Sequence, residues 1–388
     1  MTHLQNNGLG SVLVLALGTF AVGTDAFIVS AFLPEMAREL GVTTAVAGQS
    51  VTIFAMAYAL LAPVIATLTA TLPRRRLLMA ALFFLGLANV GSALAPSFGF
   101  LIATRIAAAA AAAAYTPNAG AVAAQLVGPE QRARALAIVI GGLSVSTALG
   151  VPLGHVASTL FDWRTALTLV GLVAFCALLG VALLMPNVAG TPRVSLGQRL
   201  SVLRRPQAMV VLPLTVLGMT ACYVPYAYTV PLLADLLVPG ALVTVMLFCY
   251  GVGAMTGNYV SGVMTDRRGP ILVLAGAYLL LIAALAALLT LSTLQIASHV
   301  VIVGLLVFSW GAATWSQSPA QQVRLIAAVP EQASVAIALN ASAIYVGIAL
   351  GTAIGGAAIG HGAPMALAAG LTVAVLALFY VLLTRRWA

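Results

Sequence analysis

The heptapeptide ALGVPLG at residues 148–154 recurs as ALGTAIG at residues 349–355, an offset of 201 residues. The tripeptide PEQ repeats at the same offset, at residues 129–131 and 330–332. Either short match alone could arise by chance, but two matches at one offset indicate a duplicated chain. The sequence therefore predicts two halves of similar structure.

The composition is that of a membrane protein. Of the 388 residues, 62% are apolar and 6% are charged, and the mean hydropathy is +1.11. Soluble domains carry about a quarter charged residues, so this composition excludes an ordinary soluble enzyme and a disordered chain. The formal net charge of +9 does not indicate nucleic-acid binding, because the basic residues lie between apolar runs rather than together on one face.

Polar residues divide the chain into twelve apolar segments, and an α-helix needs about 20 apolar residues to cross a bilayer. The predicted spans are residues 11–33, 46–70, 77–95, 98–125, 133–158, 164–186, 208–234, 240–264, 270–292, 297–323, 334–360 and 364–384. We interpret the first segment as a span rather than as a cleaved signal peptide.

The longest polar stretch, residues 187–207, is predicted to be a cytoplasmic linker between six-helix bundles at 1–186 and 208–388. Because the repeat offset covers six spans, an even number, the two halves have the same orientation. We therefore predict an all-α integral membrane fold of twelve transmembrane helices in two parallel six-helix repeats. Transporters use such repeats and bind substrate between the halves.

The basic residues are strongly asymmetric between alternate loops. All 17 are arginines, and 14 of them fall in loops on one predicted side or at the chain end. By the positive-inside rule this side is cytoplasmic, and so are both termini. The 14 are Arg74, Arg75, Arg76, Arg132, Arg134, Arg193, Arg199, Arg204, Arg205, Arg267, Arg268, Arg324, Arg385 and Arg386.

Several motifs together resemble the major facilitator superfamily over essentially the whole chain, and most resemble its bacterial twelve-span drug:proton antiporters of the sugar-efflux and chloramphenicol-resistance type. GTDAF at 23–27 and LPEM at 33–36 resemble that group's opening motif. The stretch at 141–154, with Gly150, Pro152 and Gly154, resembles the fifth-span antiporter motif, and Arg105 matches the intramembrane arginine of the fourth span.

The resemblance also implies a conformational latch after the eighth span. GVMTDRRG at 262–269 resembles the signature loop of the family, which places Gly262, Asp266, Arg267 and Gly269 in the latch. The first-half copy has Ala70 where an acidic residue is expected, so the latch must depend on Asp266 or on another partner. The fourth span has alanines at 107–114 where the family usually has glycine, which still permits close helix packing.

Asp25 and Arg105 are the two ionisable residues that lie clearly inside predicted spans, where charges are costly and mark functional sites. Helix rise puts them about 12 Å and about 10.5 Å below the same surface. Our hypothesis is that Asp25 carries the transported proton and Arg105 modulates its proton affinity. A static buried ion pair that holds the two spans together is the competing interpretation.

Two further residues are possible secondary proton sites. Glu35 lies near the outer end of the first span, where an interfacial position is the alternative. His155 follows the antiporter motif and histidine titrates near neutrality, although such a residue is more often simply a hydrogen-bonded polar group.

A cavity for drug-type substrates is mostly apolar with a few polar groups. Tyr226 lies at the repeat-equivalent position of Asp25, at the offset of 201 residues. Each candidate tyrosine has packing or interfacial anchoring as its alternative. The predicted cavity residues are Tyr58, Tyr115, Asn118, Tyr223, Tyr226, Asn258, Trp310, Trp315, Gln317, Gln321, Asn340 and Tyr345.

The sequence favours proton-coupled efflux of small amphipathic compounds, drugs included, across a bacterial inner membrane. Efflux or uptake of a sugar, nucleoside or amino acid is the alternative. A membrane enzyme or sensor is a third class, but the sequence shows no nucleophile, metal set or cytosolic domain. We expect no cofactor, no nucleic-acid partner and a monomer in contact with substrate, protons and lipid.

Overall fold

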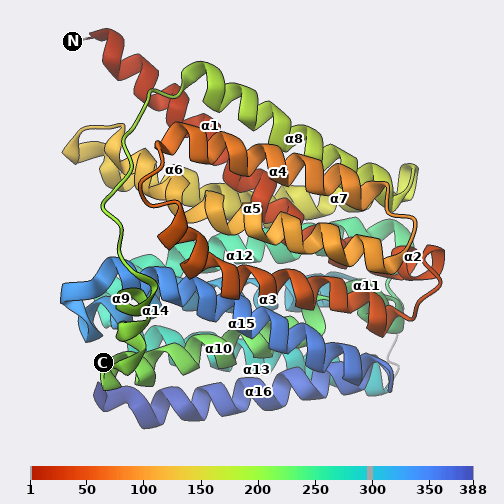
Figure 1. Cartoon of the computed structure of the whole chain (residues 1–388). Coiled ribbons are helices and arrows are strands. Elements are labelled where there is room, and N and C mark those ends of the chain that lie inside the picture. Colours follow the sequence, from red (N-terminus) through yellow and green to blue (C-terminus); the bar gives the residue numbers. More distant parts are fainter. Residues whose placement is uncertain (1, 295–299, 388) are drawn as a thin grey trace.

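The computed structural model describes residues 2–294 and 300–387, and these ranges contain helices and no strand (Figure 1). Twelve helical segments of the described chain are long and apolar enough to cross a membrane. The predicted all-α fold of twelve spans is therefore confirmed.

The first half contains six spans and several short helical turns. Its elements are α1 Thr2–Phe27, η1 Ile28–Ala31, α2 Leu33–Glu39, α3 Thr44–Leu68, α4 Arg74–Ala93, α5 Phe98–Gln125, η2 Pro129–Gln131, α6 Arg132–Val145, η3 Ser146–Gly150, α7 Val151–Leu160 and α8 Trp163–Leu184. A linker follows, with α9 Leu196–Leu200 and η4 Ser201–Arg204.

The second half repeats this plan. Its elements are α10 Pro206–Tyr226, α11 Thr229–Asp235, α12 Gly240–Arg268, α13 Pro270–Leu294, α14 Val300–Ala328, η5 Pro330–Gln332, α15 Ala333–Ile359, α16 Ala363–Leu383 and η6 Thr384–Trp387. In each half, the first span is followed by a short helix (α2, α11), and the repeated PEQ forms a 3₁₀ turn (η2, η5).

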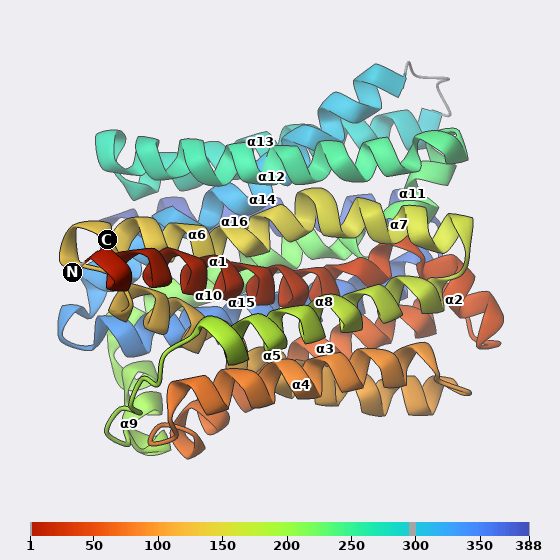
Figure 2. The ribbon, with the colours of Figure 1, turned by 90° about the horizontal axis from the view of Figure 1, so that it is seen from above.

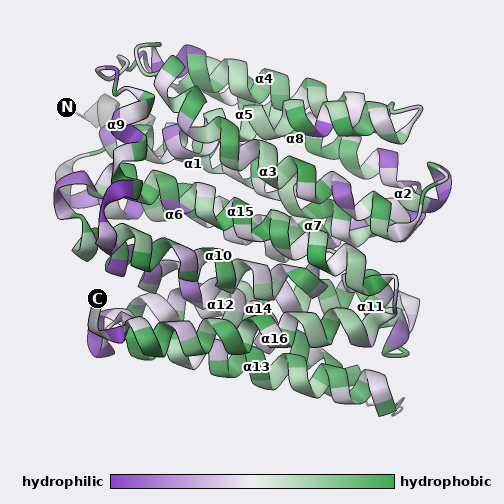
Figure 3. Ribbon diagram, turned by 60° about the horizontal axis from the view of Figure 1, so that its bottom comes forward, coloured by the Kyte–Doolittle hydropathy of each residue, from purple (hydrophilic) through white to green (hydrophobic). Residues whose placement is uncertain are grey.

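The molecule has two chemically different ends. The N- and C-terminal ends and the linker lie together at the left in Figure 1, and we call this the arginine-rich end. The short helices α2 and α11 lie at the other end, which we call the α2 end. Hydrophilic residues gather mainly at these two ends, and hydrophobic residues cover the helices between them (Figure 3).

Two seams join the halves. Helix α15 packs along α3, and α12 packs along α6, η3 and α7 (Figure 2). At the second seam a Cβ on Gly251 would lie 2.2 Å from the Cα of Ala148 and 2.5 Å from the carbonyl oxygen of Thr147. Only glycine permits this backbone contact, because any side chain at position 251 would push α12 away from η3.

Three spans are less regular than the sequence predicted. The segment expected at 11–33 changes from α1 to η1 after Phe27, and the one expected at 208–234 is interrupted between Tyr226 and Thr229. The fifth span contains a π-helical turn, η3, which ends two residues before Pro152. Proline lacks a backbone N–H, so Pro225 and Pro152 weaken the regular α-helical bonding near these irregularities.

The α2 end has a well-defined helix start at Asp162. Its carboxylate accepts hydrogen bonds from the Thr165 backbone N–H at 2.6 Å and from the Thr165 hydroxyl at 2.7 Å. These bonds hold the pKa of Asp162 below its usual value, with the Thr165 side chain as the largest cause. The cap satisfies backbone donors that a helix start otherwise leaves unpaired.

We expect Asp162→Ala to lower the stability of the folded protein by about 1 kcal/mol at neutral pH, the usual cost of losing a helix cap. Because the folded-state pKa is depressed, the carboxylate's extra contribution is complete above the unfolded value and is lost as the pH falls through the folded value. Thermal unfolding in detergent at pH 7 and pH 3 measures this. Asp162→Asn, which keeps a neutral cap, should be about as stable as the wild type at pH 3. If Asp162→Asn lost the same stability at pH 7 and at pH 3, the charge of the carboxylate would not contribute as we expect.

Candidate transport site

Asp25 of α1 and Arg105 of α5 form an ion pair in the interior of the first half. Arg105 Nη1 donates to Asp25 Oδ1 at 2.5 Å, and Nη2 donates to the Asp25 carbonyl oxygen at 2.9 Å. Both residues have no exposed surface. The guanidinium also lies 4.4 Å from the centre of the Phe54 ring on α3, a cation–π contact.

The pair is not fully satisfied by hydrogen bonds. Asp25 Oδ2 and Arg105 Nε are buried, and neither has a hydrogen-bond partner within the described ranges. Buried polar atoms are normally paired, and unpaired ones at a charged site are candidates for a chemical role. Asp25 therefore has one carboxylate oxygen held by arginine and one that is available to a proton.

An aromatic cluster from both halves begins two residues after Asp25. The Phe27 ring centre lies 6.0 Å from that of Tyr223, 6.3 Å from that of Tyr226 and 6.2 Å from that of Trp315. We call this group, completed by Tyr250 and Trp310, the central aromatic cluster. Tyr250 lies 4.8 Å from Tyr226 and 5.2 Å from Trp310 between ring centres.

The cluster also offers hydrogen-bond donors. The indole Nε1 atoms of Trp310 and Trp315 are buried and have no acceptor in the described part of the chain. Sequence reasoning identified four of the six cluster members and missed Phe27 and Tyr250. The position of Phe27 next to the buried aspartate on α1 is the signal that could have found it.

A second aromatic contact crosses the α3–α15 seam. Tyr58 of α3 stacks on Tyr345 of α15, with ring centres 3.7 Å apart and planes inclined by 20°. Phe54, which contacts Arg105, lies 6.4 Å from Tyr345. These rings connect the ion pair of the first half to α15 of the second half.

Two predicted cavity residues of α5 lie elsewhere, which corrects the sequence interpretation. Tyr115 is fully buried against α1, where its hydroxyl donates to the Leu15 carbonyl oxygen at 3.1 Å. Asn118 lies near the arginine-rich end, where its Oδ1 accepts from Arg74 Nη1 at 2.9 Å. Eight neighbouring alanines give α5 little contrast between faces, so the sequence did not specify which way these side chains point.

The predicted amides Gln317, Gln321 and Asn340 of the second half bond to neighbouring side chains and backbone groups. Gln317 accepts from the Tyr278 hydroxyl at 3.0 Å, and Gln321 donates to Thr215 at 3.0 Å. Thr215 donates in turn to Asn340 at 2.8 Å. These residues border a cavity of about 10 Å³, so they line a narrow internal space rather than a large one. Asn258 is half-buried on α12.

The first-half loop that lacks an acidic residue is held by a different set of bonds. Arg74 is buried, and besides its bond to Asn118 its Nη2 donates to the Ala70 carbonyl oxygen at 3.0 Å and to the Thr191 hydroxyl at 2.7 Å. Arg74 therefore ties the loop to α5 and to the linker without a carboxylate.

The expected second-half latch is not formed. Asp266 is exposed, and the two ion pairs found among the described residues are Arg105–Asp25 and Arg164–Glu39. Arg267 is also exposed, and Gly262 has open space around its α-carbon. Gly269 ends α12 with φ of +81°, a conformation that favours glycine. The likeness to the signature loop therefore extends to the turn but not to a charge contact in this conformation.

The antiporter-motif glycines are contact points with the helix of Asp25. A Cβ at Gly150 would lie 2.2 Å from Thr24 Oγ1, and one at Gly154 would lie 2.3 Å from Ile28 Cδ1. Pro152 is buried between them in α7. The π-helical turn η3 is thus packed between α1 on one side and α12 on the other.

The two possible secondary proton sites lie away from the ion pair. Glu35 is half-buried on α2 outside the first span, and burial, the largest influence, raises its pKa. His155 is buried on α7, and its Nδ1 lies 2.8 Å from the Thr244 hydroxyl of α12. His155 therefore bridges the halves near the α2 end.

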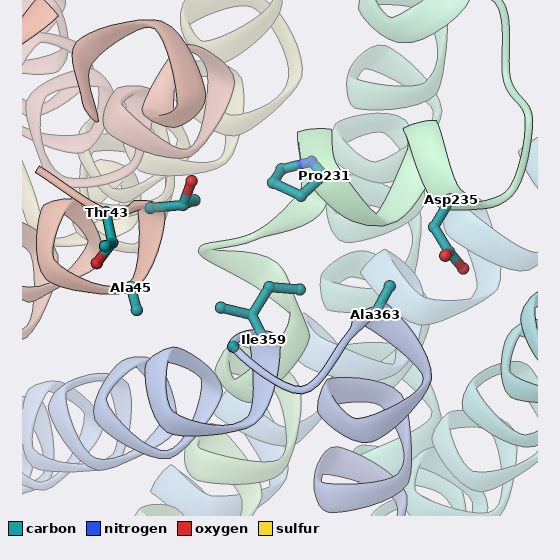
Figure 4. A pocket seen from close by; sticks show the side chains of 8 residues that line it. Thr43, Ala45, Pro231, Asp235, Ile359 and Ala363 are labelled. Atoms are coloured by element: carbon teal, nitrogen blue, oxygen red, sulfur yellow. The ribbon is translucent and has the colours of Figure 1, made fainter. Parts of the chain in front are cut away.

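A pocket of about 380 Å³ opens at the α2 end, between the start of α3, the end of α15 and α11 (Figure 4). Tyr228, three residues before the pocket residue Pro231, is fully buried, and its hydroxyl donates to the Thr352 carbonyl oxygen at 3.1 Å. A Cβ at Gly48 would lie 2.1 Å from this hydroxyl, and one at Gly356 would lie 2.7 Å from it. Tyr228 therefore fills the space between α3 and α15 at this seam.

Solved structures share this fold. The D-xylose–proton symporter matches with a TM-score of 0.79 and 15% identity, covering 96% of this chain and 97% of that one. A bacterial homologue of the human lysosomal transporter Spinster matches with a TM-score of 0.74 and 16% identity, covering 97% and 96%. These likenesses show that the chain has the same overall fold as these two solved proteins.

Sequence comparison identifies the family. The profile of the Major Facilitator Superfamily matches residues 15–352. The MFS-type transporter YbcL of Bacillus subtilis is 32% identical over 89% of this chain and 87% of its own length. The chloramphenicol resistance protein of Streptomyces lividans is 31% identical over 90% and 88%. The chain belongs to the Major Facilitator Superfamily and is a multi-pass membrane protein.

Proposed function

We propose that the protein exports small amphipathic compounds that carry an aromatic ring, in exchange for protons, by alternating access. The observation that carries the proposal is the buried Asp25–Arg105 pair beside an aromatic cluster contributed by both halves. The first feature suits proton coupling, and the second suits an apolar cargo bound at the interface of the halves.

In this proposal Asp25 holds the proton on Oδ2, and Arg105 sets how tightly it is held. A carboxylate binds protons more weakly near a guanidinium and more strongly when it is desolvated away from one. A small movement of α1 relative to α5 during the cycle changes the distance between the carboxylate and the guanidinium. Opening the site to water changes the desolvation of the carboxylate. Either change would let the proton load on one side of the membrane and leave on the other.

The cargo class follows from the lining. Aromatic rings from α1, α10, α12 and α14 offer faces and edges for stacking, and two indole N–H groups offer donors. The ion pair has no net charge, which favours a neutral cargo. The chloramphenicol resistance protein of Streptomyces lividans supports the same class by family likeness.

Transport of a polar metabolite is the alternative. The fold likeness to the D-xylose–proton symporter is consistent with it. A sugar site needs free hydrogen-bonding side chains. Gln317, Gln321 and Asn340 already bond to neighbouring groups. This internal bonding supports the aromatic cargo over the sugar.

We place the arginine-rich end in the cytoplasm and the chain in a bacterial inner membrane, following the positive-inside rule. Arg38 lies on α2 and Arg164 pairs with Glu39 of α2, so these two arginines lie at the α2 end, which would face outward. The energy would come from the proton gradient, and the proposal needs no cofactor.

Transport in proteoliposomes that contain a pH-sensitive dye tests the proposal. Gradients of neutral aromatic drugs, cationic dyes, sugars, nucleosides and amino acids are imposed in turn. Proton movement driven by the aromatic compounds supports the proposal, and proton movement driven by sugars alone supports the alternative. Substrate movement without any proton movement would contradict antiport and indicate a facilitator.

A further inference from the structure

A pocket of about 490 Å³ lies at the arginine-rich end, between the last turns of α3 and the linker. One wall consists of Val64, Thr67 and Leu68 of α3, and Leu68 is 63% exposed. The other wall consists of the linker residues Arg193, Ser195, Leu196 and Gln198. The pocket is therefore apolar on the side of the span and polar and basic on the side of the linker.

The linker wall is held in place by backbone bonds to the first half. The Thr191 N–H donates to the Ala70 carbonyl oxygen at 2.8 Å, and the Arg74 N–H donates to the Val188 carbonyl oxygen at 2.8 Å. Ser195 and Gln198 then form a reciprocal capping box at the start of α9. The backbone at Arg193, between these two fixed points, is therefore held in place, and its exposed side chain is available to a ligand.

A second arginine, Arg199, directly follows the pocket residue Gln198 in α9. Arg199 Nη2 donates to the Ala66 carbonyl oxygen at 3.3 Å, one residue before Thr67 in the opposite wall. Its Nε is buried and has no partner in the described ranges. Burial lowers the pKa of Arg199, but a guanidinium stays charged at any physiological pH.

No acidic residue accompanies these charges in the sequence. The stretches that supply the two walls, residues 40–129 and 163–234, contain no Asp or Glu at all. The two ion pairs of the described chain involve Arg105 and Arg164 instead. The positive charge at the pocket is therefore left for an anion from outside the protein.

We propose that this pocket binds the headgroup of an anionic phospholipid, with Arg193 at its phosphate, Arg199 adding a second positive charge and Val64 and Leu68 contacting the start of an acyl chain. The pocket lies at the end of the span Thr44–Leu68, which is the depth of lipid headgroups. An apolar wall beside a basic wall matches the two chemistries of a phospholipid. Basic segments near a membrane surface are attracted to anionic lipids.

Lipid binding here would act on the arrangement of the halves. The linker touches the first half at Ala66 through Arg199, and three residues later Val202 is buried in a cluster with Leu325 and Val329 of the second half. A lipid in the pocket would bridge α3 and the linker. It would therefore stabilise the conformation in which the linker lies against α3.

Native mass spectrometry of the full-length protein, titrated with phosphatidylglycerol or phosphatidylcholine, tests the site. We expect Arg193→Gln/Arg199→Gln to lower phosphatidylglycerol affinity about tenfold or more, because each arginine near a headgroup contributes substantially to lipid attraction. Arg204→Gln/Arg205→Gln removes the same charge from linker positions outside the pocket lining and should change the affinity far less. If both double variants lost the same phosphatidylglycerol affinity, the loss would reflect net charge alone, and the proposed site would be wrong.

A second measurement uses only the wild type. Phosphatidylglycerol with a photoreactive group near its headgroup should crosslink to residues 64–68 and 193–198, and crosslinks confined to other faces would overturn the proposal. Phosphatidylcholine retained as strongly as phosphatidylglycerol would mean that the pocket does not select anionic lipid. Inorganic phosphate that stabilises the protein as well as the lipid does would identify a free-anion site instead.

Discussion

Asp25→Asn is expected to abolish substrate-driven proton movement while substrate binding and substrate exchange persist. The substitution keeps the size of the side chain and an oxygen that can accept from Arg105, but it removes the group that can bind a proton. Asp25 is the one buried carboxylate among the described residues, so no nearby acid is positioned to replace it. Uphill transport in proteoliposomes should therefore fall to background.

Substrate exchange distinguishes a proton-coupling role of Asp25 from a purely structural one. If the pair only holds α1 to α5, the unpaired Arg105 costs about 3–5 kcal/mol, and exchange, binding and melting temperature fall together. If Asp25 carries the proton, exchange of labelled for unlabelled substrate continues and only the dependence on a proton gradient is lost. Asp235→Asn, which changes a carboxylate at the α2 end, serves as the matched control. Full proton-driven transport by Asp25→Asn would rule out the proposed role.

Gly251→Ala is expected to open the seam between α12 and η3. The added Cβ would lie 2.2 Å from the Cα of Ala148, and backbone cannot move aside as a flexible side chain can. Overpacking of this kind costs about 1–3 kcal/mol, which lowers the population of the closed seam by roughly 5- to 150-fold. We expect transport to fall strongly, because the cycle requires the seam to close as well as to open.

Labelling of a cysteine at position 244, in a background without the native cysteines, reports the opening. Thr244 faces His155 across the seam, so Gly251→Ala should speed its reaction with a membrane-impermeant maleimide. Gly276→Ala on α13 is the matched control, because its Cβ would meet nothing within 4 Å. Unchanged labelling and transport in Gly251→Ala would show that the seam tolerates a side chain.

The fold was largely predictable from the sequence. Hydropathy and polar breaks indicated the twelve spans, and the repeats at 148–154 and 349–355 indicated two related halves. Helix rise alone placed Asp25 and Arg105 at similar depth, and the structure brings them into contact. Depth along a helix follows from residue number because each residue adds a fixed rise, so it can be predicted from the sequence.

Rotation about a helix axis was much less predictable. Tyr115 and Asn118 lie three residues apart on an alanine-rich helix, and neither contributes to the central aromatic cluster. Phe27 and Tyr250 do contribute to it; Phe27 follows Asp25 by two residues, but nothing in the immediate sequence of Tyr250 distinguishes it from a packing residue. A span surrounded by lipid and protein is apolar on every face, so periodicity does not identify its inward side.

Contacts between segments distant in the chain could also not be predicted from the sequence. Ala70 removed the acid on which the first-half latch was expected to depend, and the structure compensates with bonds from Arg74 to Asn118 and Thr191. The role of Tyr228 between Gly48 and Gly356 depends on α3, α15 and the turn between α10 and α11 meeting at one point. Such arrangements follow from tertiary packing, which a single sequence specifies but does not display.

The neutrality of the Asp25–Arg105 pair has an electrical consequence. With both partners charged, the empty site would change conformation without moving net charge through the electric field. A proton on Asp25 would leave the guanidinium charge of Arg105 uncompensated. Each conformational change with the proton bound would therefore move one positive charge through the field. Under the proposed mechanism, export of a neutral compound would therefore draw on voltage as well as on the pH difference, about 2.3 kcal/mol for every 100 mV per proton.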